Sequence, residues 1–221
     1  MNLRNSLLDA LALISPIECA GCLDPDRSLC SACAPQFAPV VTEHSLASGT
    51  PVWAAVEYDG VVRRGVLAFK ERGRTDIART LGRGLAASIR AAVRGAPDQP
   101  VLVAVPSSSA SFARRGYDPV AMLIRRAGFR QKRALVAANS AAAQKSLSVD
   151  QRRTNRENYL RATRSLVGVR AIIVDDVLTT GATLEAAERA ILRAGGQVCG
   201  AAVLARTPKK FGAHDLLGQL S

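Results

Sequence analysis

Four short apolar runs along the chain predict β-strands. Three of them are continuous stretches of apolar residues, the pattern of strands that are buried on both faces of a parallel sheet. The remaining run ends at the turn signal Asp59-Gly60. The four runs cover residues 52–58, 101–105, 171–174 and 198–204.

Helical spacing of apolar residues fills the stretches between these runs. It extends over residues 61–94 with a break at Gly73, recurs at residues 112–127, and returns at residues 184–194, where a Gly-Gly pair ends it. Residues 133–164 are polar and basic and predict no clear element. Strands that alternate with helices predict an α/β fold with a mainly parallel sheet flanked by helices on both faces.

The N-terminal region differs from the rest of the chain. Residues 1–18 have apolar residues at helical spacing, which predicts a docked amphipathic helix. A signal peptide is the alternative, but Asp9 interrupts the apolar stretch and no small-residue cleavage site follows. Residues 19–33 hold four of the five cysteines, and residues 34–51 are rich in Pro, Ser and Thr, as in a linker. The expected domains are residues 1–51 and 52–221.

Charge and composition favour anionic partners without choosing among them. The chain has 30 Lys and Arg against 18 Asp and Glu, a formal net charge of +12. Phosphate ligands, nucleic acids and acidic protein surfaces all fit this balance. Aromatic residues make up only 4%, which disfavours a single-stranded nucleic-acid binder with stacking side chains. No apolar run approaches the roughly 20 residues of a membrane-spanning helix, and we expect a cytoplasmic protein.

Four cysteines form two Cys-x-x-Cys pairs, Cys19 with Cys22 and Cys30 with Cys33, and seven residues separate the pairs. Two such pairs provide the tetrahedral four-sulfur site that structural zinc prefers, although this gap is shorter than in common zinc ribbons. Two disulfides are an alternative that a cytoplasmic α/β chain disfavours. A redox pair would not need two copies. The remaining Cys199 lies in an apolar strand, and we expect it in the core.

An apolar strand, two acids, a Thr-rich loop and a helix follow one another at residues 172–184. In an open α/β sheet, ligands lie beyond the carboxyl ends of the strands, and a helix N-terminus there attracts phosphate. Asp175 and Asp176 would repel phosphate, so sugar hydroxyls and a divalent cation are their natural partners. Gly181 lets the backbone approach a phosphate closely. The loop hydroxyls that can donate to this phosphate belong to Thr179, Thr180 and Thr183.

Other interpretations of these glycine-containing segments are weaker. An ordinary strand–turn–helix with a Thr N-cap is the plain alternative, but chance produces the whole string in this order much less readily. The string is not a P-loop, because the Lys of that motif is missing. Residues 82–87 match a dinucleotide-binding fingerprint formally, but no strand precedes them, so we treat the match as chance.

Residues 174–183 resemble the phosphoribosyl pyrophosphate motif of type I phosphoribosyltransferases. Over nearly its whole length, the chain more narrowly resembles the ComF family, which is related to competence and gluconate-utilisation proteins. The four-cysteine region before the domain is typical of that family. The other residues that carry the resemblance are Tyr58-Asp59-Gly60, Arg63, Lys70, Gly73-Arg74, Val105-Pro106, Arg115-Gly116-Tyr117, Gln144, Leu147, Arg152 and Asn155.

The resemblance implies a site for phosphoribosyl pyrophosphate and Mg²⁺. Asp175 and Asp176 would be the catalytic acids that hold the ribose hydroxyls. The following loop would hold the 5-phosphate, and a serine loop after an earlier strand would approach the pyrophosphate. Relatives usually have a His and a longer basic stretch in that serine loop, and Thr where this chain has Lys145. The implied ligand-binding residues are Thr179, Thr180, Gly181, Ala182, Thr183, Pro106, Ser107, Ser108, Lys70, Arg115 and Arg152.

Three functions remain open at this point. As an enzyme, the protein would displace pyrophosphate from the sugar C1 with a nitrogen nucleophile, and no base pocket is readable in the N-terminal region that would supply one. As a non-catalytic module, it would sense phosphoribosyl pyrophosphate or a nucleotide and engage a helicase-like partner in DNA uptake. As a DNA-binding protein, it would use the basic cluster Arg125, Arg126, Arg130, Lys132 and Arg133.

Overall fold

The computed structural model describes residues 17–25, 27–137 and 159–208. Most of the amphipathic helix that the sequence predicts at the N-terminus lies outside these residues. The same holds for a group of residues that carry part of the family resemblance. This group comprises Gln144, Lys145, Leu147, Arg152 and Asn155.

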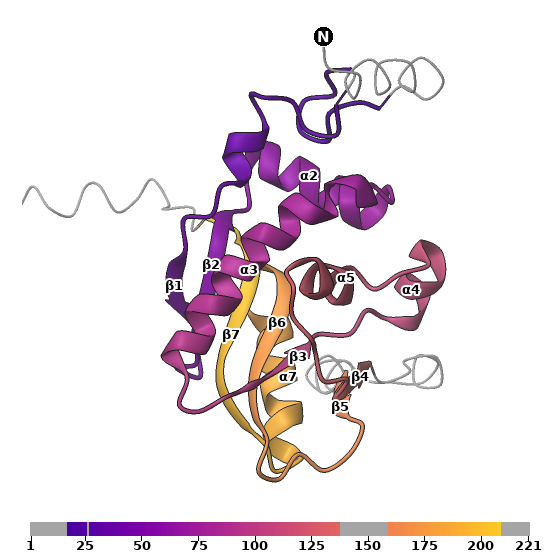
Figure 1. The fold of residues 1–221 in the computed structure, drawn as a ribbon. Coiled ribbons are helices and arrows are strands. Elements are labelled where there is room, and N and C mark those ends of the chain that lie inside the picture. Colours follow the sequence, from indigo (N-terminus) through magenta and orange to yellow (C-terminus); the bar gives the residue numbers. More distant parts are fainter. Residues whose placement is uncertain (1–16, 26, 138–158, 209–221) are drawn as a thin grey trace, which may run out of the picture.

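A five-stranded sheet forms the centre of the molecule, in the order β1-β2-β7-β6-β3 (Figure 1). Strands β2, β7, β6 and β3 run parallel, and the short β1 pairs antiparallel with β2 at one edge. The predicted α/β fold with a mainly parallel sheet is therefore confirmed. The strand bounds are β1 Thr42–Ser45, β2 Pro51–Glu57, β3 Val101–Ala104, β6 Arg170–Leu178 and β7 Gln197–Arg206.

Alternation along the strands divides the core into two layers. In β6, Ile172 and Val174 pack into one cluster, while Ala171 and Ile173 pack into the other. The first cluster includes the buried faces of α3 (Ala78–Gly95) and α5 (Pro119–Arg126). The second includes α7 (Ala182–Arg193) and a two-stranded sheet of β4 (Leu135–Ala137) and β5 (Leu160–Ala162). Both faces of the central sheet are thus covered by helices, as in other mainly parallel sheets.

Glycines divide the two longer helical regions that the sequence predicts. The first region forms α2 (Gly60–Glu71), the short η2 (Thr75–Ile77) and α3, and Gly73 between α2 and η2 has a φ of +67°. The second forms α4 (Ser109–Arg115) and α5, and Gly116 between them has a φ of +73°. Only glycine adopts this left-handed conformation readily, so the breaks are fixed locally.

Two segments differ from the sequence-based expectation. The strand expected to end at residue 174 extends to Leu178, so both acids lie inside β6 and not in a loop. Residues 34–51, expected to be a linker, contain η1 (Ala34–Phe37) and β1. The segment around β1 shows no apolar alternation, since β1 is an edge strand held by its pairing with β2.

Candidate functional site

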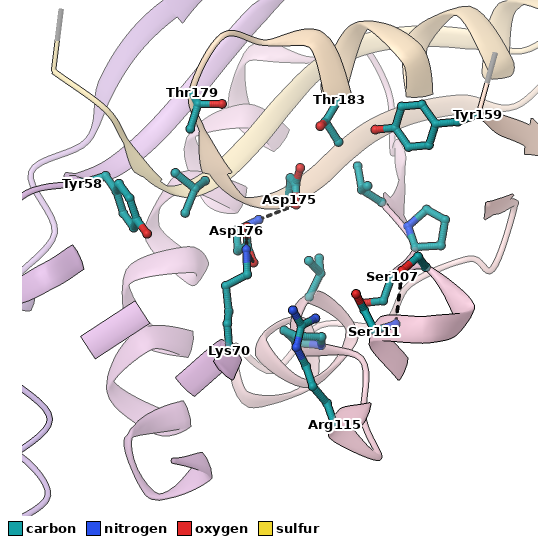
Figure 2. A pocket seen from close by; sticks show the side chains of 16 residues that line it. Tyr58, Lys70, Ser107, Ser111, Arg115, Tyr159, Asp175, Asp176, Thr179 and Thr183 are labelled. Atoms are coloured by element: carbon teal, nitrogen blue, oxygen red, sulfur yellow. Dashed lines mark hydrogen bonds and ion pairs between the residues drawn. The ribbon is translucent and has the colours of Figure 1, made fainter. Parts of the chain in front are cut away.

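A cleft of about 360 Å³ opens at the carboxyl ends of the parallel strands. Tyr58 follows β2 directly and Val105 follows β3, while β6, which carries both acids, lies between these strands in the sheet. Figure 2 shows the labelled side chains of the cleft. Carboxyl ends of parallel strands meet at one edge of the sheet, which explains why segments far apart in sequence converge here. The lining residues are Tyr58, Lys70, Val105, Pro106, Ser107, Ser108, Ser111, Arg115, Pro119, Val120, Tyr159, Asp175, Asp176, Val177, Thr179 and Thr183.

The two acids point to opposite sides of β6, because neighbouring side chains in a strand alternate. Asp176 points toward the end of α2, where Lys70 Nζ lies 2.8 Å from its Oδ2 and 3.1 Å from its Oδ1 (Figure 2). Asp175 points to the other side, and its Oδ1 accepts a 2.8 Å hydrogen bond from the backbone N–H of Asp176. Both side chains are buried. The cleft therefore contains one neutralised carboxylate and one without a cationic partner among the described residues.

Burial and neighbouring charges shift the pKa values of Asp175 and Lys70. Burial of Asp175 and the neighbouring charge of Asp176 raise the pKa of Asp175 well above its usual range, although the Asp176 N–H and Lys70 oppose the shift. Burial also disfavours the charge of Lys70, but the Asp176 carboxylate outweighs it and raises the pKa of Lys70. Lys70 is therefore a fixed cation, and Asp175 is the acid whose charge responds most to a bound ligand.

The Thr-rich loop is only partly directed into the cleft. Thr179 and Thr183 line it, whereas Thr180 and Ala182 are exposed outside it. Gly181 has a φ of +87°, and a Cβ at this position would meet Leu46 Cδ2 at 3.1 Å. The structure thus gives Gly181 a backbone and packing reason that is independent of any ligand.

The N-terminus of α7 is open to the cleft. Within the described residues, the N-cap Gly181 has no side chain to cap the first turn, and the Thr180 hydroxyl accepts a long 3.4 Å hydrogen bond from Ala182 N. Unpaired N–H groups and the positive end of the helix dipole favour a bound anion. Thr183, in that first turn, adds a hydroxyl on the cleft side (Figure 2).

The serine loop between β3 and α4 forms the opposite wall. Ser107 N donates to Asp118 Oδ2 at 3.1 Å, and the other oxygen of Asp118 caps α5 by accepting from Ala121 N at 2.9 Å. Ser108 caps α4 by accepting from Ser111 N at 3.2 Å. Protein contacts thus fix the loop, and its hydroxyls remain available as donors.

Arg115 forms the basic wall of the cleft. Its Nη2 lies 2.7 Å from Glu71 Oε1, and Arg114 holds the other oxygen of Glu71 at 3.1 Å. Arg115 Nε is buried without a hydrogen-bond partner in the part of the chain that the structure describes. A guanidinium that is held on one side and has a spare donor is suited to a phosphate ligand.

Among the polar lining residues, three were not expected from the sequence as ligand-binding residues: Tyr58, Ser111 and Tyr159. Tyr58 had a usable signal, since it ends a predicted strand at the same edge of the sheet as the acids. Tyr159 had none, because tertiary packing against α7 brings it to the cleft. Burial raises the pKa of Tyr159, while the Thr183 side chain acts in the opposite direction. The predicted Arg152 lies outside the described residues.

Comparison with known proteins decides the family. Residues 75–215, well over half of the chain, match the phosphoribosyl transferase domain family. The chain belongs to this family. Most residues that line the cleft lie within the matched segment, whereas Tyr58 and Lys70 precede it.

Individual proteins that are similar to this chain are named phosphoribosyltransferases. A segment of 37 residues is 65% identical to adenine phosphoribosyltransferase from Streptomyces galbus, which covers 17% of this chain and 20% of that protein. The chain thus matches about a fifth of the length of that curated relative. Orotate phosphoribosyltransferase from Mycobacterium tuberculosis H37Rv is 21% identical, with 79% of this chain and 82% of that chain covered and a TM-score of 0.36. The Aeropyrum pernix orotate phosphoribosyltransferase is 17% identical over 79% of both chains, with a TM-score of 0.34.

Four cysteines lie together before the phosphoribosyl transferase domain. The sulfur atoms of Cys19, Cys22, Cys30 and Cys33 are all within 4.8 Å of one another. A tetrahedral site with Zn–S bonds of about 2.3 Å places its sulfurs about 3.8 Å apart, so the four sulfurs are near enough to one another to share one zinc ion. Cys199 is a free cysteine in β7, and it is partly exposed where the sequence predicts a core residue.

The surroundings of Cys19 favour a thiolate, the form that binds metal. The backbone N–H groups of Gly21 and Cys30 each lie 3.4 Å from Cys19 Sγ. Burial opposes the charge, but these N–H groups and that of Cys22 outweigh it and lower the pKa of Cys19 to about 6. Such N–H···S contacts orient and stabilise metal-bound thiolates.

No helix in residues 17–25, 27–137 and 159–208 has the length and apolar character needed to cross a membrane.

Proposed function

We propose that this protein binds phosphoribosyl pyrophosphate with Mg²⁺ in the cleft and is a phosphoribosyltransferase. The observation that carries the proposal is the convergence of three kinds of group on one cleft: an open helix N-terminus, two carboxylates, and the cations Lys70 and Arg115. Each kind matches one part of the ligand. Membership of the phosphoribosyl transferase domain family supports the same ligand class.

The open N-terminus of α7 would bind the 5-phosphate. Thr179 and Thr183 add hydroxyl donors on the cleft side of the same loop. The carboxylates of Asp175 and Asp176 would accept hydrogen bonds from the two ribose hydroxyls. An ionised phosphate has no such donors, so the sugar is the better partner for these acids. This arrangement places the sugar over β6 and leaves its C1 facing the serine loop.

The serine loop, Arg115 and Lys70 would bind the pyrophosphate. Mg²⁺, which prefers oxygen ligands from carboxylates and phosphates, would neutralise the charge of the leaving group. The bond between C1 and the pyrophosphate oxygen breaks, the bond from C1 to a nitrogen nucleophile forms, and the nucleophile loses one proton. Positive charge develops on the sugar in this transition state, so Asp175 and Asp176 stabilise it electrostatically.

We also propose that the four cysteines hold one structural Zn²⁺. All four ligand positions of a tetrahedral site are filled by sulfur, so no position is left for catalysis. The narrower assignment to the ComF family is likewise a proposal. It is supported by this cluster preceding the domain and by the residues around Tyr58 and Lys70 that the family shares.

A second candidate is a non-catalytic module that senses the same ligand and contacts DNA or a helicase-like partner in DNA uptake. The observation that favours it is a surface without acids. Neither α3 nor the stretch 119–137 contains an Asp or Glu, and together they carry many exposed cations. These cations are Arg79, Arg83, Arg90, Arg94, Arg125, Arg126, Arg130 and Arg133.

Calorimetry followed by a pyrophosphate-release screen tests both candidates. The purified protein is titrated with phosphoribosyl pyrophosphate and Mg²⁺, and release is then measured across a panel of nucleobases. Release with one base supports the enzyme, and binding without release with any base supports the module. Absence of binding contradicts both.

A further inference from the structure

A second cleft, of about 470 Å³, lies at the other end of α7. Thr183 in the first turn of α7 lines the first cleft, and Arg193 in its last turn lines the second. A rise of about 1.5 Å per residue separates these two positions by roughly 15 Å. The lining residues are Arg161, Ala162, Arg164, Ser165, Ala190, Arg193 and Ala194.

The charged side chains that line this cleft are all positive. Three of its seven lining residues are arginines and none is an acid. Arg161 and Arg164 are exposed, and neither forms an ion pair with a carboxylate of the described residues. Other arginines of the protein do pair, as Arg74 does with Asp76 at 2.8 Å. Arg161 and Arg164 therefore carry positive charge that no carboxylate of the described residues neutralises.

Helix capping does not explain these arginines. The C-terminal carbonyls of a helix attract cations, and a basic residue there is often only a cap. In α7, however, backbone N–H groups already satisfy these carbonyls: Leu166 N donates to Ala194 O at 2.7 Å, and Gly196 N donates to Ile191 O at 3.0 Å. Arg193 Nη2 reaches Leu160 O on β5 at 3.5 Å, which keeps this side chain at the rim.

The floor of the cleft is apolar and small. Ala162, Ala190 and Ala194 line it, and their short side chains leave the hollow between β5 and α7. Its volume of about 470 Å³ lies in the range of small-molecule sites, and a phosphorylated small molecule with a flat apolar part matches its arginines and alanines. Guanidinium groups bind phosphate with paired N–H donors, and they stack on aromatic rings.

We propose that this arginine-lined cleft is a second binding site, which takes a phosphate-bearing small molecule such as a nucleoside monophosphate. Arg161 and Arg164 bind the phosphate, and the alanine floor contacts the base. The site is separate from the phosphoribosyl pyrophosphate cleft and does not depend on the proposed function.

The test compares two variants of the full chain that lose equal charge. Arg161→Gln with Arg164→Gln removes the proposed ligands, and Arg79→Gln with Arg83→Gln removes two exposed arginines of α3 that line neither cleft. AMP and inorganic phosphate are titrated separately by calorimetry, and circular dichroism checks the fold. We expect the first variant to lose one AMP site or to bind it at least tenfold more weakly. The α3 variant should bind AMP like the wild type.

Counting sites separates this proposal from the proposed function. If AMP also enters the first cleft, the wild type has two AMP sites and the Arg161/Arg164 variant keeps one. If the first cleft does not take nucleotides, the wild type has one site, which the variant loses. Phosphate competing with AMP at the lost site assigns recognition to the phosphate group. Equal AMP binding in the wild type and the Arg161/Arg164 variant, or an equal loss in both variants, overturns the proposal. So does a variant that loses affinity only for a random oligonucleotide.

Discussion

At the scale of single residues, Asp175 and Asp176 differ because β6 directs them to opposite sides. Asp176 is neutralised by Lys70 at 2.8 Å, whereas Asp175 is buried beside a like charge. A buried acid without a cation is costly for the free protein and useful once a ligand donates hydrogen bonds to it. This contrast makes Asp175 the residue at which stability and binding conflict.

Asp175→Asn should therefore stabilise the free protein near neutral pH. The folded state raises the pKa of Asp175, so the group contributes stability that is present below its unfolded pKa and is lost as the pH rises through the folded pKa. Asn has no such loss. We expect the Tm of the variant to exceed that of the wild type by a few degrees at neutral pH, since about 1 kcal/mol corresponds to roughly 2–4 °C at this size.

Thermal melts from pH 4 to pH 8 measure this effect. The difference in Tm between variant and wild type should shrink toward the acid end. Asp59→Asn, at the exposed cap of α2, is the control for the same chemical change at an exposed position. A difference that grows as the pH falls would contradict the raised pKa.

Thr183→Val should weaken the binding of phosphoribosyl pyrophosphate by about 1–3 kcal/mol, because a hydrogen bond to a charged phosphate is lost. Thr180 is exposed and outside the lining, so Thr180→Val should lose less. Both variants replace a Thr hydroxyl by a methyl group, so each serves as the control for the other. Binding is measured by calorimetry. A larger loss of affinity in Thr180→Val than in Thr183→Val would contradict the prediction that the phosphate lies on the Thr183 side of the loop.

At the scale of elements, α2 connects the cysteine cluster to the cleft. A Cβ on Gly21 would meet Val61 of α2 at 2.7 Å, and Arg64 of α2 donates to the Gly21 carbonyl. Phe37, after the cluster, packs against Gly65. The same helix ends next to Lys70, the partner of Asp176. The cysteine cluster therefore contacts the helix that positions a cation in the cleft.

We expect one tightly bound zinc per chain, and its removal should lower both Tm and ligand affinity. Zinc at a thousandfold excess over its Kd stabilises by about 4 kcal/mol, equivalent to roughly 8–16 °C at this size. Elemental analysis and melts before and after chelation measure this. Cys199→Ser is the control and should keep the metal, since Cys199 is not part of the cluster. Well-folded, metal-free protein with four free thiols would sink the zinc assignment.

Sequence predicts an element well where its signal is local. The order of strand, acids, Thr loop and helix at residues 172–184 is such a signal, and the glycines that break the helices are another. The full length of β6 is not local: Asp is depleted in strands, and Asp175 is held there by its register opposite Val203 of β7. The position of Tyr159 is not local either, because packing against the core beside α7 brings this residue to the cleft.

At the scale of the whole molecule, the charge of +12 is unevenly distributed. The first cleft contains both signs, whereas the second cleft and the surface of α3 and α5 contain no acids among their described residues. Phosphate-rich ligands are attracted to such surfaces over distances of about 8–10 Å at physiological salt.

Any affinity for DNA should be weak, sensitive to salt and independent of sequence. Charge supplies the attraction, and few aromatic side chains are present for stacking. Titrations of random single strands between 50 mM and 200 mM salt should show a loss of affinity of at least tenfold, in line with several phosphate contacts. Tight binding that persists at high salt, or a clear sequence preference, would contradict this picture.

The most direct test of the whole account is calorimetry with phosphoribosyl pyrophosphate and Mg²⁺ on the wild type and on the double variant Asp175→Asn with Asp176→Asn. Asn keeps the shape of the side chains but loses the charge that would hold the ribose hydroxyls. The wild type should bind one equivalent in the cleft, and the double variant should stay folded and show no binding. A folded double variant that binds as well as the wild type would show that the ligand site has been placed wrongly.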